Sequence, residues 1–458
     1  MAGGGPTVDD IRSSSHPTST VRVQSYCMLC STYLVLWWRE RPIMPEGRTV
    51  PVEARDRERS DTGAPAAPTW WVWLAAWPVT AVFVLSNAAT PLYVLWQRDI
   101  GFSQGTLTVV FAFYIVGLLG SLLVSGVLSD RIGRKPVLLP ALALALAACL
   151  IFATAHTVAA LIVARLFTGI AVGAIVSAGM AAVTDVAGQD RRRLAALPAS
   201  CAMVFGAGLG PLLAGILSET LPAPTVTVFV VEAALLITAI LAVLRMPVRR
   251  PAAPAAPAKG AWVRVPGVPH GNGTQLTRGI AVFAPGITAT SFVLSLGPSL
   301  LSDLLNTTSR IVAGAMAFAM FLAATGVQFA VQKLPRRTIL TAGAVSTTLS
   351  MIALIVAVRT SWIPALIASA LLAGAGQGMG QLGGLSLLNS TVPPRRLAEA
   401  NAALNVGGYV PAGLLPVSAG YLSDAVGLTG GATLFGLVLM ALAVAGGIVV
   451  VVSGRGRA

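Results

Sequence analysis

The chain has 458 residues, of which 55% are hydrophobic and only 10% are charged. Soluble domains carry about 25% charged residues, and a soluble fold of this length has too little interior to bury so much apolar surface. The composition therefore excludes an ordinary soluble protein and indicates a chain whose apolar faces lie in lipid. The net charge of +14 does not indicate nucleic-acid binding, because the basic residues are spread over short loops between apolar segments.

The first 69 residues form a polar leader rich in Ser, Thr, Pro and Arg, which we expect to be a disordered cytoplasmic segment. Its one apolar run, residues 26–38, is too short to span a bilayer. Cys27 and Cys30 form a single CxxC pair without a second pair, and the three histidines are scattered. We therefore expect no metal site and no cofactor.

From residue 70 onward, long apolar segments alternate with short polar loops. Each segment has about the 20 residues that a helix needs to cross a bilayer, and in lipid the backbone groups of such a segment must be satisfied internally. The sequence therefore predicts an all-α integral membrane protein. The predicted spans are residues 71–94, 105–128, 137–156, 158–182, 197–219, 225–247, 279–302, 309–332, 338–358, 362–388, 398–424 and 429–452.

A proline-rich stretch at residues 248–278 divides these spans into two sets of six. Such a stretch resists helix formation and behaves as a semi-extended linker. We expect one bundle over residues 70–247, a cytoplasmic linker, a second bundle over residues 279–452, and a tail at residues 453–458.

Basic residues predict the orientation of the spans. They concentrate in alternate loops, at residues 131–135, 191–193, 333–337 and 395–396. The positive-inside rule places these loops and both termini in the cytoplasm. We therefore expect a multi-pass protein of the plasma membrane.

The two predicted bundles contain matching segments. Residues 210–219 (GPLLAGILSE) resemble residues 415–424 (LPVSAGYLSD). Because the matches continue in register across two spans, they indicate an internal repeat, and carriers often build a midplane site between two such halves. Glycine pairs at the same offset occur in the fourth and tenth spans, at Gly169, Gly173, Gly374 and Gly378.

The loop between the second and third spans carries the most specific pattern, GVLSDRIGRK at residues 126–135. Its first glycine allows close helix packing, its second permits a tight turn, and its bases hold the loop at an anionic membrane surface. An ordinary basic loop does not need these residues in this order. The candidate residues are Gly126, Asp130, Arg131, Gly133, Arg134 and Lys135.

This pattern resembles the signature loop of the major facilitator superfamily. The resemblance implies twelve transmembrane helices in two pseudo-symmetric six-helix bundles, with the loop latching the halves in the outward-facing state. It also implies that Asp130 contacts the eleventh span, and that Arg134 or Arg131 pairs with an acid at the cytoplasmic end of the fourth span. Asp185 matches that acid. The equivalent loop of the second half, residues 326–337, keeps its bases but lacks the aspartate.

The fifth span contains the pattern GAGLGPLLAG at residues 206–215. Gly206 and Gly210 lie four residues apart on one helix face, so a partner helix can approach closely, and Pro211 removes one backbone hydrogen bond. A general glycine packing seam would explain this pattern. With Gly215, the pattern also resembles the antiporter motif of the superfamily's twelve-span drug:proton exporters, which implies exchange rather than uptake.

Arg165 is the only base deep in a predicted span, and Glu232 is the only acid at such depth. Each lies about seven residues from the outer end of its span, which is roughly 10 Å at the rise of an α-helix. Arg165 also resembles the family's membrane-buried arginine, which is often linked to proton coupling. We hypothesise an Arg165–Glu232 pair that is either a structural ion pair or part of a proton path.

Several amides and a tyrosine in the spans are candidates for a substrate cavity. The resemblance implies that spans one, four, seven and ten line it, and an interhelical hydrogen bond is an equal alternative for each residue. As a set, they suit a hydrophobic or weakly polar substrate better than a highly charged one. They are Asn87, Gln377, Gln381, Asn401, Asn405 and Tyr409.

The sequence therefore predicts a secondary active transporter that works by alternating access, and not an enzyme. It contains no P-loop pattern, which argues against an ATP-driven pump. The first hypothesis is proton-coupled efflux of small hydrophobic compounds. The alternatives are uptake or facilitated diffusion of a metabolite, and a receptor or scaffold that does not transport. The expected partners are a small-molecule substrate, the bilayer and protons, without nucleic acid, and we expect a monomer.

Overall fold

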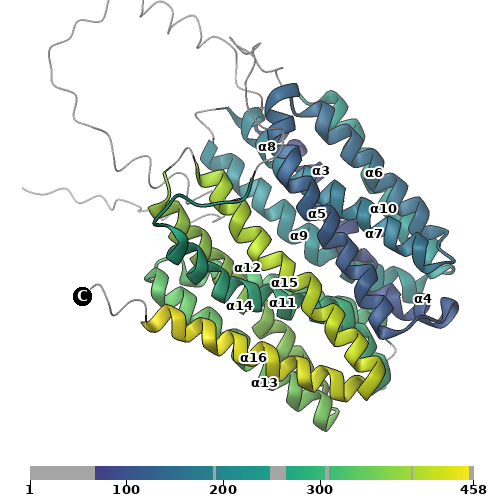
Figure 1. The fold of residues 1–458 in the computed structure, drawn as a ribbon. Coiled ribbons are helices and arrows are strands. Elements are labelled where there is room, and N and C mark those ends of the chain that lie inside the picture. The colour runs from purple at the N-terminus through teal and green to yellow at the C-terminus, as the bar shows by residue number, and fades with distance from the viewer. Residues whose placement is uncertain (1–67, 189–191, 248–264, 305–308, 394–395, 453–458) are drawn as a thin grey trace, which may run out of the picture.

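The computed structural model describes residues 68–188, 192–247, 265–304, 309–393 and 396–452. Long helices make up nearly all of this part of the chain and form two groups side by side (Figure 1). The first group comprises α3 (Thr69–Ala88), a 3-10 turn (Thr90–Leu92), α4 (Tyr93–Ile100), α5 (Gln104–Ile132), α6 (Lys135–Ala153), α7 (Val158–Ala174), a π-helical turn (Ile175–Gly179), α8 (Met180–Ala187), α9 (Arg192–Thr220) and α10 (Pro224–Arg245). The second comprises α11 (Gly273–Ser299), a π-helical turn (Leu300–Leu304), α12 (Arg310–Val331), α13 (Arg336–Thr360), α14 (Ile363–Thr391), α15 (Leu397–Val426) and α16 (Leu428–Val452).

Short turns join α3 to α4 and α7 to α8, so each of these pairs forms a single span and each half contains six spans. Within the described ranges, 11 spans are long and apolar enough to cross a membrane. The remaining span, α15, is 30 residues long but less apolar, because it carries amides such as Asn401 and Asn405. The predicted all-α fold of two six-helix bundles is confirmed.

The largest shifts of the predicted boundaries are six residues. The first span continues to Ile100 instead of residue 94, and α11 begins at Gly273, so residues 273–278 of the expected linker are already helical. The expected leader up to residue 67, linker residues 248–264 and the tail lie outside the described residues.

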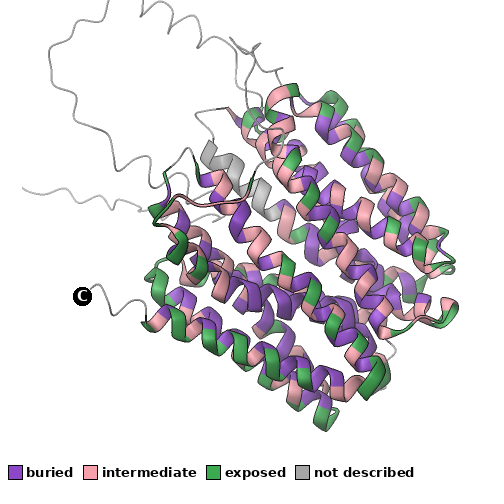
Figure 2. Ribbon diagram, viewed as in Figure 1, coloured by how far each residue is buried: buried purple, intermediate pink, exposed green. Residues whose placement is uncertain are grey.

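Burial distinguishes central spans from peripheral ones. In the first span 72% of the residues in the most apolar stretch are buried, and in the seventh 89%, against 39% in α10 and 33% in α16. Figure 2 shows the same division, with exposed residues along the outer faces and buried residues between helices. The first and seventh spans are therefore central, and the sixth and twelfth spans present much of their surface to lipid.

The matched glycines make matched contacts. A side chain at Gly169 or Gly173 would overlap the backbone of α5, the second span. A side chain at Gly374 or Gly378 would overlap the backbone of α12, the eighth span. The internal repeat therefore recurs in the helix packing, because equivalent glycines bring equivalent helices together.

Candidate functional site

The loop between α5 and α6 marks one end of the bundle, which we call the basic end. Gly133 ends α5 with a φ of 100°, a conformation that favours glycine. The turn places Arg134 at the start of α6, where Nη1 lies 2.6 Å from Asp130 Oδ1 and Nε lies 2.9 Å from Asp185 Oδ2. The structure thus brings together the arginine and the fourth-span acid that the resemblance implies.

The guanidinium of Arg134 remains charged in this setting. Partial burial lowers its pKa, but the bonds to Asp185 and Asp130 raise it further, so the net pKa lies above its ordinary value. Lys135 donates to the Leu244 carbonyl at the end of α10, at 2.8 Å. All these partners belong to the first half.

One implied contact of this loop is not formed. Asp130 is exposed and pairs with Arg134, four residues along the chain, instead of reaching α15, the eleventh span. Arg131, the next residue after Asp130, lies in the last turn of α5. Gly126 is half-buried one turn earlier in the same helix. Asp130, Arg134 and Lys135 of the loop therefore bond within their own half.

The opposite end of the bundle is organised around the starts of α5 and α12. The first N–H groups of a helix have no partner within the helix. Ser103 caps α5 by accepting a bond from the Thr106 N–H at 3.2 Å, and Ser309 caps α12 by accepting from the Val312 N–H at 3.3 Å. In both halves, a serine thus satisfies the third N–H of the helix.

The N–H groups that precede the capped ones at the starts of α5 and α12 are also bonded. In each case the acceptor is a carboxylate of the opposite half. Asp424, at the end of α15, accepts bonds from the Gln104 and Gly105 N–H groups, each at 2.9 Å. Glu219, at the end of α9, accepts from the Ile311 N–H at 3.0 Å. We call these the Asp424 contact and the Glu219 contact. The two acids are the last residues of the matched segments 210–219 and 415–424, so the same contact occurs twice.

The fifth-span glycines pack against two helices. Side chains at Gly206 and Gly210 would overlap the backbone of α3 in the same half. A side chain at Gly215 would overlap the backbone of Arg310, and one at Gly314 would overlap the Pro211 carbonyl, both between α9 and α12. The motif therefore serves as a packing seam within the first half and between the halves.

Arg165 occupies the centre of the first half and is fully buried. Its Nε donates to the Tyr93 hydroxyl, and its Nη1 donates to the Ser86 carbonyl at 2.7 Å. The guanidinium carbon also lies 5.0 Å from the centre of the Tyr93 ring and 5.7 Å from those of Phe111 and Phe152. First-span hydrogen bonds and aromatic faces hold this cation in place.

Glu232 is buried but does not pair with Arg165. Arg165 is bonded to Tyr93 and Ser86, and Glu232 Oε2 has no hydrogen-bond partner among the described residues. The Phe152 ring lies beside Arg165 and stacks at 4.8 Å on Phe229, one turn from Glu232. The hypothesised direct pair is therefore not formed in this structure.

Tyr114 on α5 lies near Arg165, at the boundary between the halves. Its ring centre is 6.3 Å from that of Phe111, the ring that also faces Arg165, and α5 packs against α15, which carries Tyr409. Tyr409 in turn packs edge-on against Phe283 of α11, with ring centres 6.4 Å apart. The sequence singled out Tyr409 but missed Tyr93 and Tyr114, since isolated tyrosines in apolar spans form no pattern.

The amide candidates divide into two groups. Asn87 forms hydrogen bonds within the protein, because its Nδ2 donates to Ser86 Oγ at 3.0 Å and to the Ala207 carbonyl at 3.4 Å. Gln377 Oε1 and Asn401 Oδ1 are buried acceptors without a partner among the described residues. Gln381 and Asn405 are half-buried on the same helices.

Residues 72–330, more than half of the chain, match the Major Facilitator Superfamily. The chain belongs to the major facilitator superfamily. Similar folds include the nucleoside transporter NupG (TM-score 0.67, 13% identity, 83% of this chain and 99% of that one) and a bacterial homologue of the lysosomal transporter Spinster (TM-score 0.68, 13% identity, 86% and 98%). As a member of this superfamily, the chain is a multi-pass membrane protein with a transporter fold.

Curated relatives of this superfamily member match shorter stretches. The multidrug resistance protein MdtL of Klebsiella pneumoniae is 35% identical over 96 residues, which is 21% of this chain and 24% of that protein. MdtL of Escherichia coli O45:K1 is 30% identical over 117 residues, or 25% and 30%. The chain thus matches about a quarter of the length of these relatives.

Proposed function

We propose that this transporter exports small hydrophobic or weakly polar compounds in exchange for protons, by alternating access between its two halves. The proposal places it in the plasma membrane as a monomer, with the basic end and both termini in the cytoplasm. It is supported chiefly by Tyr114 and Tyr409 on α5 and α15, two helices that pack together across the halves, and by the partial similarity to multidrug resistance proteins.

The chemistry of this region suits such a substrate. The rings of Tyr114, Tyr409 and Phe283 offer apolar faces, and Gln377 and Asn401 offer hydrogen-bond acceptors that lack partners in the described structure. A buried acceptor without a partner costs about 1–3 kcal/mol, so a bound donor would be favoured there. Apolar compounds with a hydroxyl or amine donor fit this arrangement better than multiply charged ones.

The contacts between the halves fit alternating access. The Asp424 and Glu219 contacts join the halves at the opposite end, while the signature loop binds within the first half. We infer that this structure is closed at the opposite end. Exposed contacts of this size can break and form again as the halves rock.

Growth inhibition in a drug-sensitive bacterial host tests export directly. Cells expressing the chain should tolerate higher concentrations of some apolar compounds than cells carrying the empty vector. Inside-out vesicles should then accumulate one of these compounds when given a proton gradient and lose it when the gradient is collapsed. Accumulation in right-side-out cells instead would indicate uptake, and no movement in either preparation would contradict transport of the compounds tested.

Arg165 and Glu232 test the proton step. Glu232→Gln removes the buried ionisable group at nearly constant shape, and Arg165→Ala removes the cation that holds Tyr93 and Ser86. If either group lies on the proton path, exchange driven by a pH gradient should fall about tenfold or more, in line with the usual contribution of a proton-transfer group. Near-normal exchange in both variants would remove them from the proton path.

A further inference from the structure

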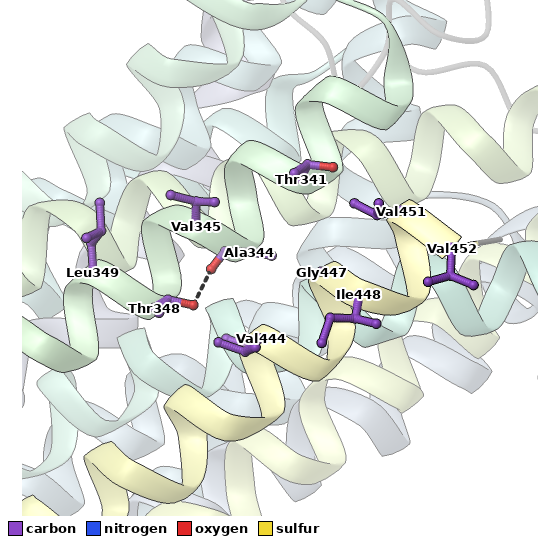
Figure 3. A pocket seen from close by; sticks show the side chains of 11 residues that line it. Thr341, Ala344, Val345, Thr348, Leu349, Val444, Gly447, Ile448, Val451 and Val452 are labelled. Atoms are coloured by element: carbon purple, nitrogen blue, oxygen red, sulfur yellow. Dashed lines mark hydrogen bonds between the residues drawn. The ribbon is translucent and has the colours of Figure 1, made fainter. Parts of the chain in front are cut away.

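A long groove runs between α13 and α16 on the outer surface of the second half. It has a volume of about 440 Å³, and it is lined by one face of residues 341–349 and one face of residues 443–452 (Figure 3). The two rows of side chains face one another across the groove, with Val345 and Ile448 among the exposed residues. Its lining is apolar apart from two threonine side chains, Thr341 and Thr348, and Thr348 Oγ1 is bonded to the Ala344 carbonyl.

Small residues form part of the lining of the groove. Gly447 has no side chain, and a Cβ there would lie 3.3 Å from the Ala344 side chain. The lining extends over nine residues of α13, which is roughly 12 Å along the helix axis. Because α16 is one of the least buried spans, the groove faces the lipid phase over this length.

Positive charge lies at the mouth of the groove, at the basic end. Arg337 Nη2 donates to the Val451 carbonyl at 2.8 Å, and Val451 lines the groove. A guanidinium has five N–H donors, so this bond leaves others for a ligand. Arg336 and Lys333 are exposed beside it, and no side chain caps the first N–H groups of α13.

We propose that the α13–α16 groove binds an anionic phospholipid, with one acyl chain in the groove and the phosphate at Arg336 and Arg337. The uncapped helix start and two guanidinium groups together form an anion site at the depth of the lipid headgroups. The apolar groove leads directly from that site into the bilayer. A zwitterionic lipid fills the groove equally well, but its ammonium group gains nothing from the bases. The inference does not depend on the direction of transport or on the substrate.

Photocrosslinking in nanodiscs tests the site. The full chain is placed in discs of phosphatidylcholine that contain a trace of phosphatidylglycerol with a photoreactive acyl chain, and crosslinked peptides are mapped by mass spectrometry. Crosslinks should concentrate in residues 341–349 and 443–452. Excess unlabelled phosphatidylglycerol should compete several-fold better than phosphatidylcholine.

Matched variants separate the two parts of the site. Arg336→Gln should lower crosslinking about fivefold, as expected for one basic residue near an anionic surface. Arg245→Gln, with an exposed arginine at the same membrane end on α10, removes the same charge away from the groove and should leave crosslinking unchanged. Val345→Trp should fill the groove and move the crosslinks elsewhere, whereas Val356→Trp, an exposed position on the same helix outside the groove, should not.

Three results would each overturn the proposal. These are equal competition by the two lipids, equal effects of Arg336→Gln and Arg245→Gln, and crosslinks spread evenly over the apolar surface. Melting temperatures of the variants, measured in the same discs, show whether a loss of crosslinking reflects a loss of fold.

Discussion

The two ends of the bundle use the same chemistry in different places. At the basic end, Asp130 and Asp185 bind Arg134, and all three belong to the first half. At the opposite end, Asp424 and Glu219 bind helix starts that belong to the other half. Carboxylates therefore bond within the first half at the basic end, and they join the two halves at the opposite end. The difference suggests that the opposite end is the closed one in this structure.

The labelling rate of a single introduced cysteine can measure how often the opposite end is open. Ser299 is 1% exposed, and its hydroxyl donates to Gln97 Oε1 at 3.2 Å between the seventh and first spans. In a chain without its native cysteines, Ser299→Cys should react slowly with a membrane-impermeant maleimide while the opposite end is closed. Each prediction below is a change in this labelling rate.

The largest effect is expected from Gly215→Leu. A side chain there would overlap the Arg310 backbone, so α9 and α12 could no longer approach. Overpacking of this kind costs typically 1–3 kcal/mol, which should raise labelling by about tenfold or more and impair transport. Gly120→Leu is the control, because a side chain at Gly120 meets nothing within 4 Å. Equal labelling of both variants would show that this interface does not control closure.

Removing both carboxylate charges should have the next largest effect. A charge at a helix start contributes about 0.3–1 kcal/mol, so Asp424→Asn or Glu219→Gln alone should raise labelling about two- to fivefold. The double variant should approach the product of the two. Asp303→Asn, an exposed acid near the same end that bonds to Ser302 of its own segment, should change nothing. No change in the double variant would mean that the contacts do not hold the halves.

Asp185→Asn should act in the opposite direction and more weakly. The family resemblance assigns the signature loop to the state in which the opposite end is open, so its loss should lower labelling. Exposed ion pairs contribute about 0–1 kcal/mol, and Asp185 is 45% exposed, so we expect a change of about twofold. An increase in labelling would mean that both ends favour the same state.

The smallest effect is expected from Arg396→Gln. Its pair with Glu399 spans one helical turn, and both side chains are more than one-third exposed. Such pairs contribute a few tenths of a kcal/mol, so labelling and export should both stay within about twofold of the parent. A large loss of export would show that Arg396 acts on something other than Glu399.

Helices and local pairings could be predicted from the sequence. Lipid leaves few alternatives to a helix for a long apolar segment, so the span ends were predicted to within about five residues, apart from the start of α11 and the end of α4. The family resemblance of the loop implied that Arg134 or Arg131 pairs with Asp185, and in the structure Arg134 makes this bond. In the fifth span, the spacing of Gly206 and Gly210 predicted the close approach of a partner helix, and the structure shows that this helix is α3.

Contacts that depend on helix rotation could not be predicted. Equal depth along two helices does not fix the direction in which side chains point, and this is why the pairing of Arg165 with Glu232 was wrong. The alignment placed Glu219 opposite Asp424, but the partners of these acids are backbone N–H groups. Any residue other than proline supplies such a group, so the sequence gives no sign of it. The roles of Tyr93 and Tyr114 were missed for a related reason. Both lie near Arg165 in the fold, but Arg165 is far from them in the sequence.

The paired carboxylates also bear on the symmetry of the two halves. The halves of this superfamily are related by a pseudo-two-fold axis along the membrane normal. Under that operation, the Glu219 contact maps onto the Asp424 contact, so the interface is isologous in the manner of a symmetric dimer. A symmetric dimer of two half-length chains would therefore need one acidic position to form both contacts, whereas this chain carries the acid at two separate positions, as glutamate in one half and aspartate in the other.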